Sequence, residues 1–160
     1  MEIPPASVLA DPDHPGYHEI RIDGGVPAAE YGVPALPALS FWVGVPPGAS
    51  VQVDAQPLEE DEWDGIRPMP VPTPRWDTGP TGEAVYSQSL EESEEAYRSP
   101  FPPATAVAGR EAGMRYLRAV PVTIFPARWD PSGGVLRAAR RVRVHVSFVP
   151  VSYTHLTLPT

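Results

Sequence analysis

Proline most limits what this chain can fold into, because 23 of its 160 residues are prolines and 13 are glycines. A proline inside a helix removes a hydrogen bond and clashes with the preceding turn, so long helices are disfavoured. The best helical stretch, SLEESEEAYRS (89–99), has few apolar residues and is expected to be a solvated turn or loop. Because the prolines are interleaved with aromatic and β-branched runs, the composition favours a loop-rich all-β domain over a disordered chain.

Alternating apolar and polar residues bounded by turn signals predict several short strands. The clearest are residues 17–22 and 140–148. The side chains of the second stretch that should face the core are Val142, Val144, Val146 and Phe148. Residues 38–45 and 50–56, joined by Pro-Pro-Gly, predict a hairpin, and Asp-Pro-Ser-Gly-Gly (130–134) predicts a second one. The pattern is typical of an antiparallel β-sandwich with long Pro-rich loops.

The chain divides into a Pro-rich lead-in (1–16), the predicted sandwich (17–149) and a tail (150–160). Within the sandwich, residues 57–82 are acidic and then Pro-rich, and little strand is expected there. The tail sequence VSYTHLTLPT resembles the translation of a transposase adapter used in sequencing libraries, so we expect it to be artefactual. The chain is then expected to be a fragment cut after Val149, and no signal peptide follows Met1.

Charge and composition exclude several classes of protein. Residues 1–95 carry a net charge of −15 and residues 96–160 one of +7, for a total of −8, which disfavours nucleic acid as a partner. The basic half is interpreted as a solvated sheet surface. No stretch approaches the roughly 20 apolar residues that a membrane helix needs. The chain has no cysteine, so it has no disulfide, no cysteine nucleophile and no thiolate metal site.

Two motifs carry a resemblance to a known family. GVPALPALSFWVGVPPGASVQV (32–53) is similar to the opening segment of the propeptides of gingipain-like cysteine peptidases, family C25. VPVTIFPARWDPSGGVLRAARRVRVHVSF (120–148) resembles the closing segment of the same propeptides. The likeness covers about residues 17–149, and it departs from the pattern at residues 123–131 and at Ala138-Ala139, where an aromatic residue is common.

The resemblance implies an all-β prodomain that assists folding and keeps a cysteine endopeptidase latent by occupying its active-site cleft. The partner would be a caspase-fold catalytic domain, normally in the same chain, and the parent protein would be secreted or at the cell surface. The fragment itself would not be an enzyme and would need no cofactor.

In Arg-specific members of this family, a prodomain loop places an arginine in the specificity pocket, and the resemblance aligns Arg75 with that position, flanked by Pro74 and Trp76. The alternating prolines of residues 70–74 bias the intervening residues to an extended conformation, which proteases bind. An arginine offers a planar fork of donors to an acidic pocket. The alternative for Arg75 is an exposed arginine in a linker loop, and Arg67 is a second candidate for the inhibitory role.

Other candidate sites are weaker. Asp11, Asp13, His14, His18 and Glu19 lie close in sequence, but the prolines between them argue against a metal site. The acidic run LEEDEWD (58–64) lacks the glycine or asparagine of a calcium loop and is interpreted as solvated.

The alternative function is a carbohydrate- or surface-binding β-sandwich whose tryptophans stack on a ligand. Trp42 is expected in the core, because it lies in an apolar strand. The others, Trp63, Trp76 and Trp129, are expected in loops, but their scattered spacing gives no platform.

Overall fold

The chain folds into strands connected by loops and turns, and its computed structural model describes residues 1–27, 30–114 and 117–151. Within these ranges there is no helix, and therefore none long and apolar enough to cross a membrane. The strands are β1 (Ser7–Ala10), β2 (His18–Arg21), β3 (Val26–Pro27), β4 (Pro37–Gly44), β5 (Ala49–Trp63), β6 (Thr73–Thr78), β7 (Ala84–Ser89), β8 (Ala106–Ala108), β9 (Ala112–Met114), β10 (Leu117–Ile124), β11 (Ala127–Asp130) and β12 (Val135–Pro150). The predicted all-β class is confirmed.

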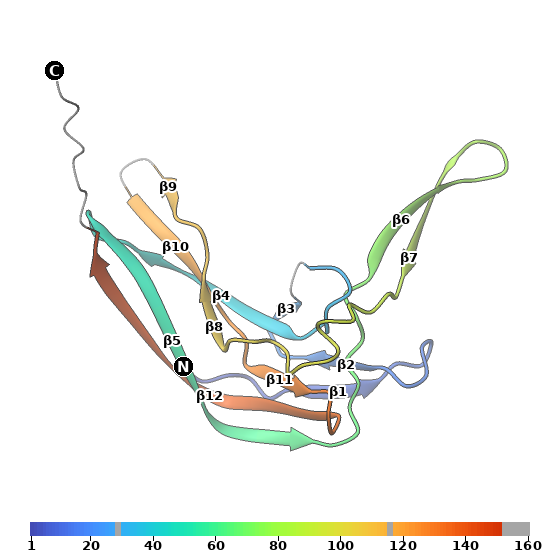
Figure 1. Cartoon of the computed structure of the whole chain (residues 1–160), viewed down its shortest axis with the longest axis horizontal. Coiled ribbons are helices and arrows are strands. Elements are labelled where there is room, and N and C mark those ends of the chain that lie inside the picture. Colours follow the sequence, from blue (N-terminus) through green and yellow to red (C-terminus); the bar gives the residue numbers. More distant parts are fainter. Residues whose placement is uncertain (28–29, 115–116, 152–160) are drawn as a thin grey trace.

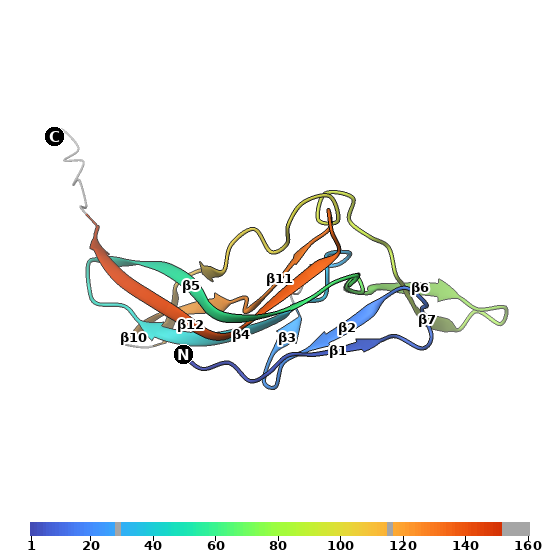
Figure 2. The same ribbon diagram turned by 90° about the horizontal axis from the view of Figure 1, so that it is seen from below.

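Two antiparallel sheets form the body of the domain. One has the strand order β3-β4-β10-β8, with β9 also paired to β10, and the other has the order β11-β12-β5. Figure 2 shows β5 and β12 of the second sheet lying over β4 and β10 of the first. A hydrophobic cluster joins the layers, with Phe41 and Val122 from the first sheet and Val53 and Val142 from the second. The predicted sandwich is therefore formed by two sheets that bury their inner faces against each other.

The predicted hairpin of residues 38–45 and 50–56 is wrong. β4 pairs with β10 and β3, whereas β5 pairs with β12, so the intervening turn carries the chain from one sheet to the other. Gly48 takes a positive φ of 70° in this turn. Alternation of apolar and polar residues cannot tell whether two strands pair in one sheet or lie in two sheets packed face to face, because each strand has one apolar face in both arrangements.

The acidic segment predicted to be loop is the second half of β5. It pairs with β12, and ion pairs cross the ladder: Arg137 lies 2.7 Å from Glu62, Arg140 2.6 Å from Asp61 and Arg141 2.9 Å from Glu59. Opposite charges on neighbouring strands stabilise a sheet. The acidic residues of the first half of the sequence and the arginines of the second half thus meet on the paired strands β5 and β12.

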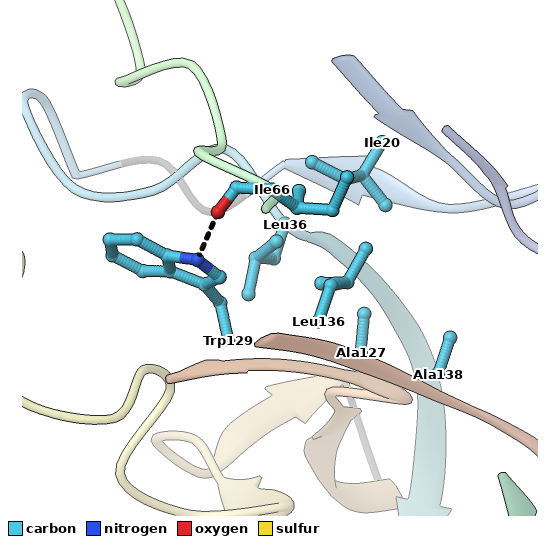
Figure 3. Packing of buried hydrophobic residues seen from close by; sticks show 7 residues of the cluster. All are labelled: Ile20, Leu36, Ile66, Ala127, Trp129, Leu136 and Ala138. Atoms are coloured by element: carbon cyan, nitrogen blue, oxygen red, sulfur yellow. Dashed lines mark hydrogen bonds between the residues drawn. The ribbon is translucent and has the colours of Figure 1, made fainter. Parts of the chain in front are cut away.

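A second core cluster contains Trp129 (Figure 3). Its buried members are Ile20, Leu36, Ile66, Ala127, Trp129, Leu136 and Ala138. The Trp129 side chain is 3% exposed, and its indole Nε1 donates a hydrogen bond of 2.7 Å to the carbonyl oxygen of Ile66. Contrary to the sequence prediction, Trp129 therefore lies in a strand and in the core.

Two other tryptophans also differ from their predictions. Trp42 was expected in the core but is 58% exposed, because alternation in β4 turns its neighbours Phe41 and Val43 inward instead. Trp63, expected in a loop, is the last residue of β5 and packs against the cluster around Trp129.

The register predicted for the last strand is correct where the strand crosses the core. The predicted 130–134 turn joins β11 to β12, which pair as an antiparallel hairpin. Val142 is completely buried and Val144 packs against the same cluster, but Phe148 is 45% exposed. The cluster at that end has only Val45, Ala49 and Val120 as buried members, and these are too few to cover an aromatic ring.

The two ends of the sequence join the fold as far as the structure describes them. Residues 1–16, expected as a lead-in, contain β1 and the buried Ile3, whose backbone N–H donates to the carbonyl of Arg140. Of the expected artefactual tail 150–160, Pro150 closes β12, and residues 152–160 lie outside the described residues.

Candidate functional site

Arg75 lies on a hairpin that projects from the body of the domain. Its strand β6 pairs with β7, with Arg75 opposite Ser87, and Figure 1 shows the two strands extending away from the sandwich. The predicted loop is therefore a strand. We call residues 73–89, which comprise β6, β7 and the turn between them, the arm.

The sequence of the arm explains its shape. Prolines before and within β6 keep the backbone extended. At the tip, Gly79 N–H donates to Glu83 O, and Gly82, with a φ of 86°, supplies a left-handed turn residue. Trp76 and Tyr86 face each other across the strands with ring centroids 5.0 Å apart. Aromatic cross-strand pairs stabilise a hairpin that has no third strand.

Arg75 is exposed and available for a partner. Within the described part of the chain, several arginines pair with a carboxylate: Arg21, Arg67, Arg98, Arg118, Arg137, Arg140 and Arg141. The structure shows no ion pair or side-chain hydrogen bond for Arg75 among these described residues. It is the one arginine of the arm, and its guanidinium would lose no internal contact on binding an acidic pocket.

Pro74 and Trp76 flank Arg75 in β6 and point to the opposite face of the arm, since side chains alternate along a strand. Pro74 is half-buried, whereas Trp76 is 69% exposed. The arm therefore presents an arginine on one face and an exposed aromatic pair on the other.

Arg67, the second candidate arginine, is occupied at the base of the arm. Its Nε and Nη2 donate to the two carboxylate oxygens of Glu92 at 2.9 and 2.6 Å. Its guanidinium carbon lies 5.8 Å from the ring centroid of Tyr17 and 5.5 Å from that of Tyr97. Arg67 could bind a partner only by breaking these contacts, whereas Arg75 has no such contacts to break.

Electrostatics support a stable charge pair at this base. Burial acts to raise the pKa of Glu92, but hydrogen bonds from Arg67 and from the Tyr17 hydroxyl outweigh it, and the pKa is lowered. The hydrogen bond to Glu92 raises the pKa of Arg67. Burial raises the pKa of Tyr97, whose hydroxyl donates to the carbonyl of Pro68 at 2.7 Å. Both members of the Arg67–Glu92 pair are therefore charged at neutral pH.

Asp11, one of the candidate metal ligands, serves local structure. Asp11 Oδ1 accepts hydrogen bonds from the backbone N–H groups of Asp13 and His14, at 2.9 and 2.7 Å, and lies 3.0 Å from the His14 ring. His18 instead accepts a hydrogen bond from the Arg67 backbone N–H. In the described ranges, no group of three histidine or acidic residues could hold a metal ion.

Of the side chains that meet at the base of the arm, sequence reasoning singled out only Arg67. Glu92 and Tyr97 lie in the stretch interpreted as a solvated turn, and Tyr17 lies 75 residues from Glu92, which its hydroxyl contacts at 2.7 Å. The one available signal was the amphipathic mixture of tyrosine and acid in residues 91–97, which is unusual for a purely solvated segment.

The domain is thus a two-sheet sandwich with a projecting hairpin that bears an exposed arginine. The chain belongs to the Propeptide_C25 family, whose model matches residues 11–155 and so spans the whole predicted sandwich. As the propeptide of a C25 cysteine peptidase, this domain is not itself the catalytic part. The family resemblance found in the sequence is confirmed.

Solved structures share the fold. A structure of gingipain K from Porphyromonas gingivalis, described for its insight into zymogenic latency, covers 90% of this chain and 80% of its own, with 20% identity and a TM-score of 0.63. The second is a complex of the pro- and mature domains of Porphyromonas gingivalis RgpB. Its alignment covers 97% of this chain and 83% of the matched chain, with 17% identity and a TM-score of 0.71. Among curated proteins no match was found.

Proposed function

We propose that this domain keeps a C25 cysteine peptidase latent by placing the arm in the active-site cleft, with Arg75 in the specificity pocket. The observation that carries the proposal is the exposure of an unpaired arginine in an extended strand that projects from the sandwich. The relatives described as a latent gingipain and as a pro–mature complex support a prodomain role. The target is an endopeptidase that accepts arginine, normally in the same chain.

The geometry of β6 suits a peptidase cleft. β6 pairs only with β7 among the described strands, so its second edge is unpaired. Such an edge can add to a sheet of the enzyme through backbone hydrogen bonds, while alternate side chains enter pockets. Because β7 already holds β6 extended, less conformational entropy is lost on docking than for a flexible loop.

The wider role follows from the family. The domain assists the folding of the peptidase and is removed when the enzyme is activated, and the parent protein is exported or displayed at the cell surface. Each of these statements is part of the proposal and is independent of which side chain occupies the pocket.

The carbohydrate-binding alternative has less support. Trp129 is enclosed in the core and Trp63 packs against it, which leaves Trp42 on a sheet of the body and Trp76 on the arm as exposed tryptophans. These two belong to different sheets and build no common stacking surface.

Replacing Arg75 with alanine tests the mechanism. An arginine desolvated against a carboxylate behaves as an interface anchor, so its loss should weaken inhibition of an active Arg-specific gingipain at least about thirtyfold. Lysine at this position should fall between, because it keeps the charge but loses the bidentate fork. The measurement is the inhibition constant against a fluorogenic arginyl peptide.

Arg110→Ala is the matched control, because Arg110 is also exposed and lacks a carboxylate partner in the described chain but lies outside the arm. It should inhibit like the native domain, and both variants should keep the native melting temperature. Native-like inhibition by Arg75→Ala would rule out the substrate-mimic mechanism.

A further inference from the structure

We infer that the Arg67–Glu92 pair, held between Tyr17 and Tyr97, is a clamp that fixes the direction in which the arm projects. The inference deepens the proposed function, because it says how Arg75 is presented, but it concerns the arm itself and can be tested without a peptidase. We call these four residues the base clamp.

The arm needs such a device because it has no core of its own. None of residues 73–89 belongs to a hydrophobic cluster of the described chain, and β6 and β7 pair only with each other. A two-stranded ribbon without further packing is marginally stable at best, so the arm has no packing of its own that fixes its direction. Its direction is therefore set by residues 65–72, which lead into it, and by residues 90–98, which lead out.

The leading segment is anchored to the body through its backbone. His18 N–H donates to Arg67 O at 2.8 Å, and Met69 N–H donates to His18 O at 3.0 Å. The Val71 N–H donates to the carbonyl oxygen of Val33 at 2.8 Å. The side chains of Pro68 and Pro70 are fully buried. This side of the base is a fixed point for the arm.

The returning segment has fewer backbone anchors, and the base clamp supplies the rest. Ser93 N–H donates to Gly32 O at 2.8 Å. Two hydrogen bonds from Arg67 and one from Tyr17 then converge on the Glu92 carboxylate. Because residues 67 and 92 lie on either side of the arm, the pair ties the two segments directly together. A bidentate arginine–carboxylate pair restricts orientation as well as distance.

Gly32 adds a second, independent constraint at the same place. It has a φ of 79°, and a Cβ there would lie 2.9 Å from the carbonyl oxygen of Glu91. Only glycine allows the returning segment to pass this close to the body. The backbone at Glu91, next to Glu92, is thus packed directly against the backbone at Gly32.

The direct test measures the spread of arm orientations. Because the chain has no cysteine, Ala84→Cys on β7 and His145→Cys on β12, both exposed positions, can carry spin labels specifically. Electron–electron double resonance should give a narrow distance distribution for the labelled native domain. In this background Glu92→Gln should at least double the width, because the neutral amide cannot accept the bidentate pair.

Glu94→Gln is the matched control. Glu94 is a neighbouring acid that pairs with Arg98, but both side chains of that pair are largely exposed, and the pair lies within the returning segment and does not tie it to the leading one. Its distance distribution should equal the native one. Gly32→Ala should broaden the distribution independently of charge. If Glu92→Gln leaves the width unchanged while it remains folded by circular dichroism, the base clamp is wrong.

The inhibition assay connects the clamp with the arm's proposed role. Glu92→Gln should weaken inhibition of the Arg-specific gingipain about tenfold in the native background and by less than twofold when Arg75→Ala is already present, since coupled residues are not additive. A broadened distribution with unchanged inhibition would support the clamp but contradict the proposed function. An unchanged distance distribution together with Arg75-dependent inhibition would contradict the clamp and support the proposed function.

Discussion

Replacing Val142 with aspartate is expected to unfold the sandwich. The Val142 side chain is completely inaccessible and packs between the two sheets, so the substitution buries a carboxylate where the cluster offers it no partner. Burying an unpaired charge costs several kcal/mol, which is a large part of the roughly 5–15 kcal/mol that stabilises a typical domain. Urea unfolding followed by circular dichroism measures the free energy of unfolding.

His145→Asp in the same strand is the control for this substitution. His145 is exposed on the outer face opposite Asp54, so the new carboxylate stays in water and adds only cross-strand repulsion, a cost of under about 1 kcal/mol. Equal effects at the two positions would show that β12 does not have the register described above.

Replacing Trp129 with alanine should be nearly as damaging, at about 3–5 kcal/mol. The substitution leaves a cavity in the cluster of Figure 3. It removes the indole N–H that donates to the carbonyl oxygen of Ile66, a buried residue. It also removes the ring against which Tyr97 packs edge-on, with centroids 5.2 Å apart. The midpoint of thermal unfolding should fall accordingly.

The same replacement at Trp42 should cost less than about 1 kcal/mol, because most of that ring is already in contact with water. The pair of variants matches a buried and an exposed tryptophan in one domain. A larger effect at Trp42 than at Trp129 would mean that the core has been assigned to the wrong side of β4.

Those parts of the fold that depend on local pattern could be predicted from the sequence. The proline content excluded helices, and strict alternation placed Val142 and Val144 on the buried face. The local pairing of β11 with β12 could be predicted from the turn between them, but the partner of β5 could not, because β5 pairs with a strand more than 70 residues away at every position. The same pairing turned an acidic run that looked like a solvated loop into a strand, since its neutralising arginines are distant in sequence.

The candidate site divides in the same way. Arg75 could be found because the family alignment and the neighbouring prolines are local features. Its placement in a paired strand was not predicted, because the prolines before and within β6 are more typical of a loop than of a strand. The base clamp was also missed, because Tyr17, Arg67 and Glu92 meet only after the body has folded.

The position of β12 in the sheet has a consequence for biosynthesis. Its ladder with β5 joins Pro150 to Ala49 and Leu136 to Trp63, so the residues of β5 must wait for partners made 73 to 101 positions later. Such non-local pairing slows folding, since the chain must close a long loop before the β5–β12 ladder can form. On a ribosome the arm emerges before the strand that completes its scaffold. Completion of the domain is therefore timed by the arrival of its last strand, and a nascent chain stalled before that point would expose the apolar inner face of β5 to chaperones or to aggregation.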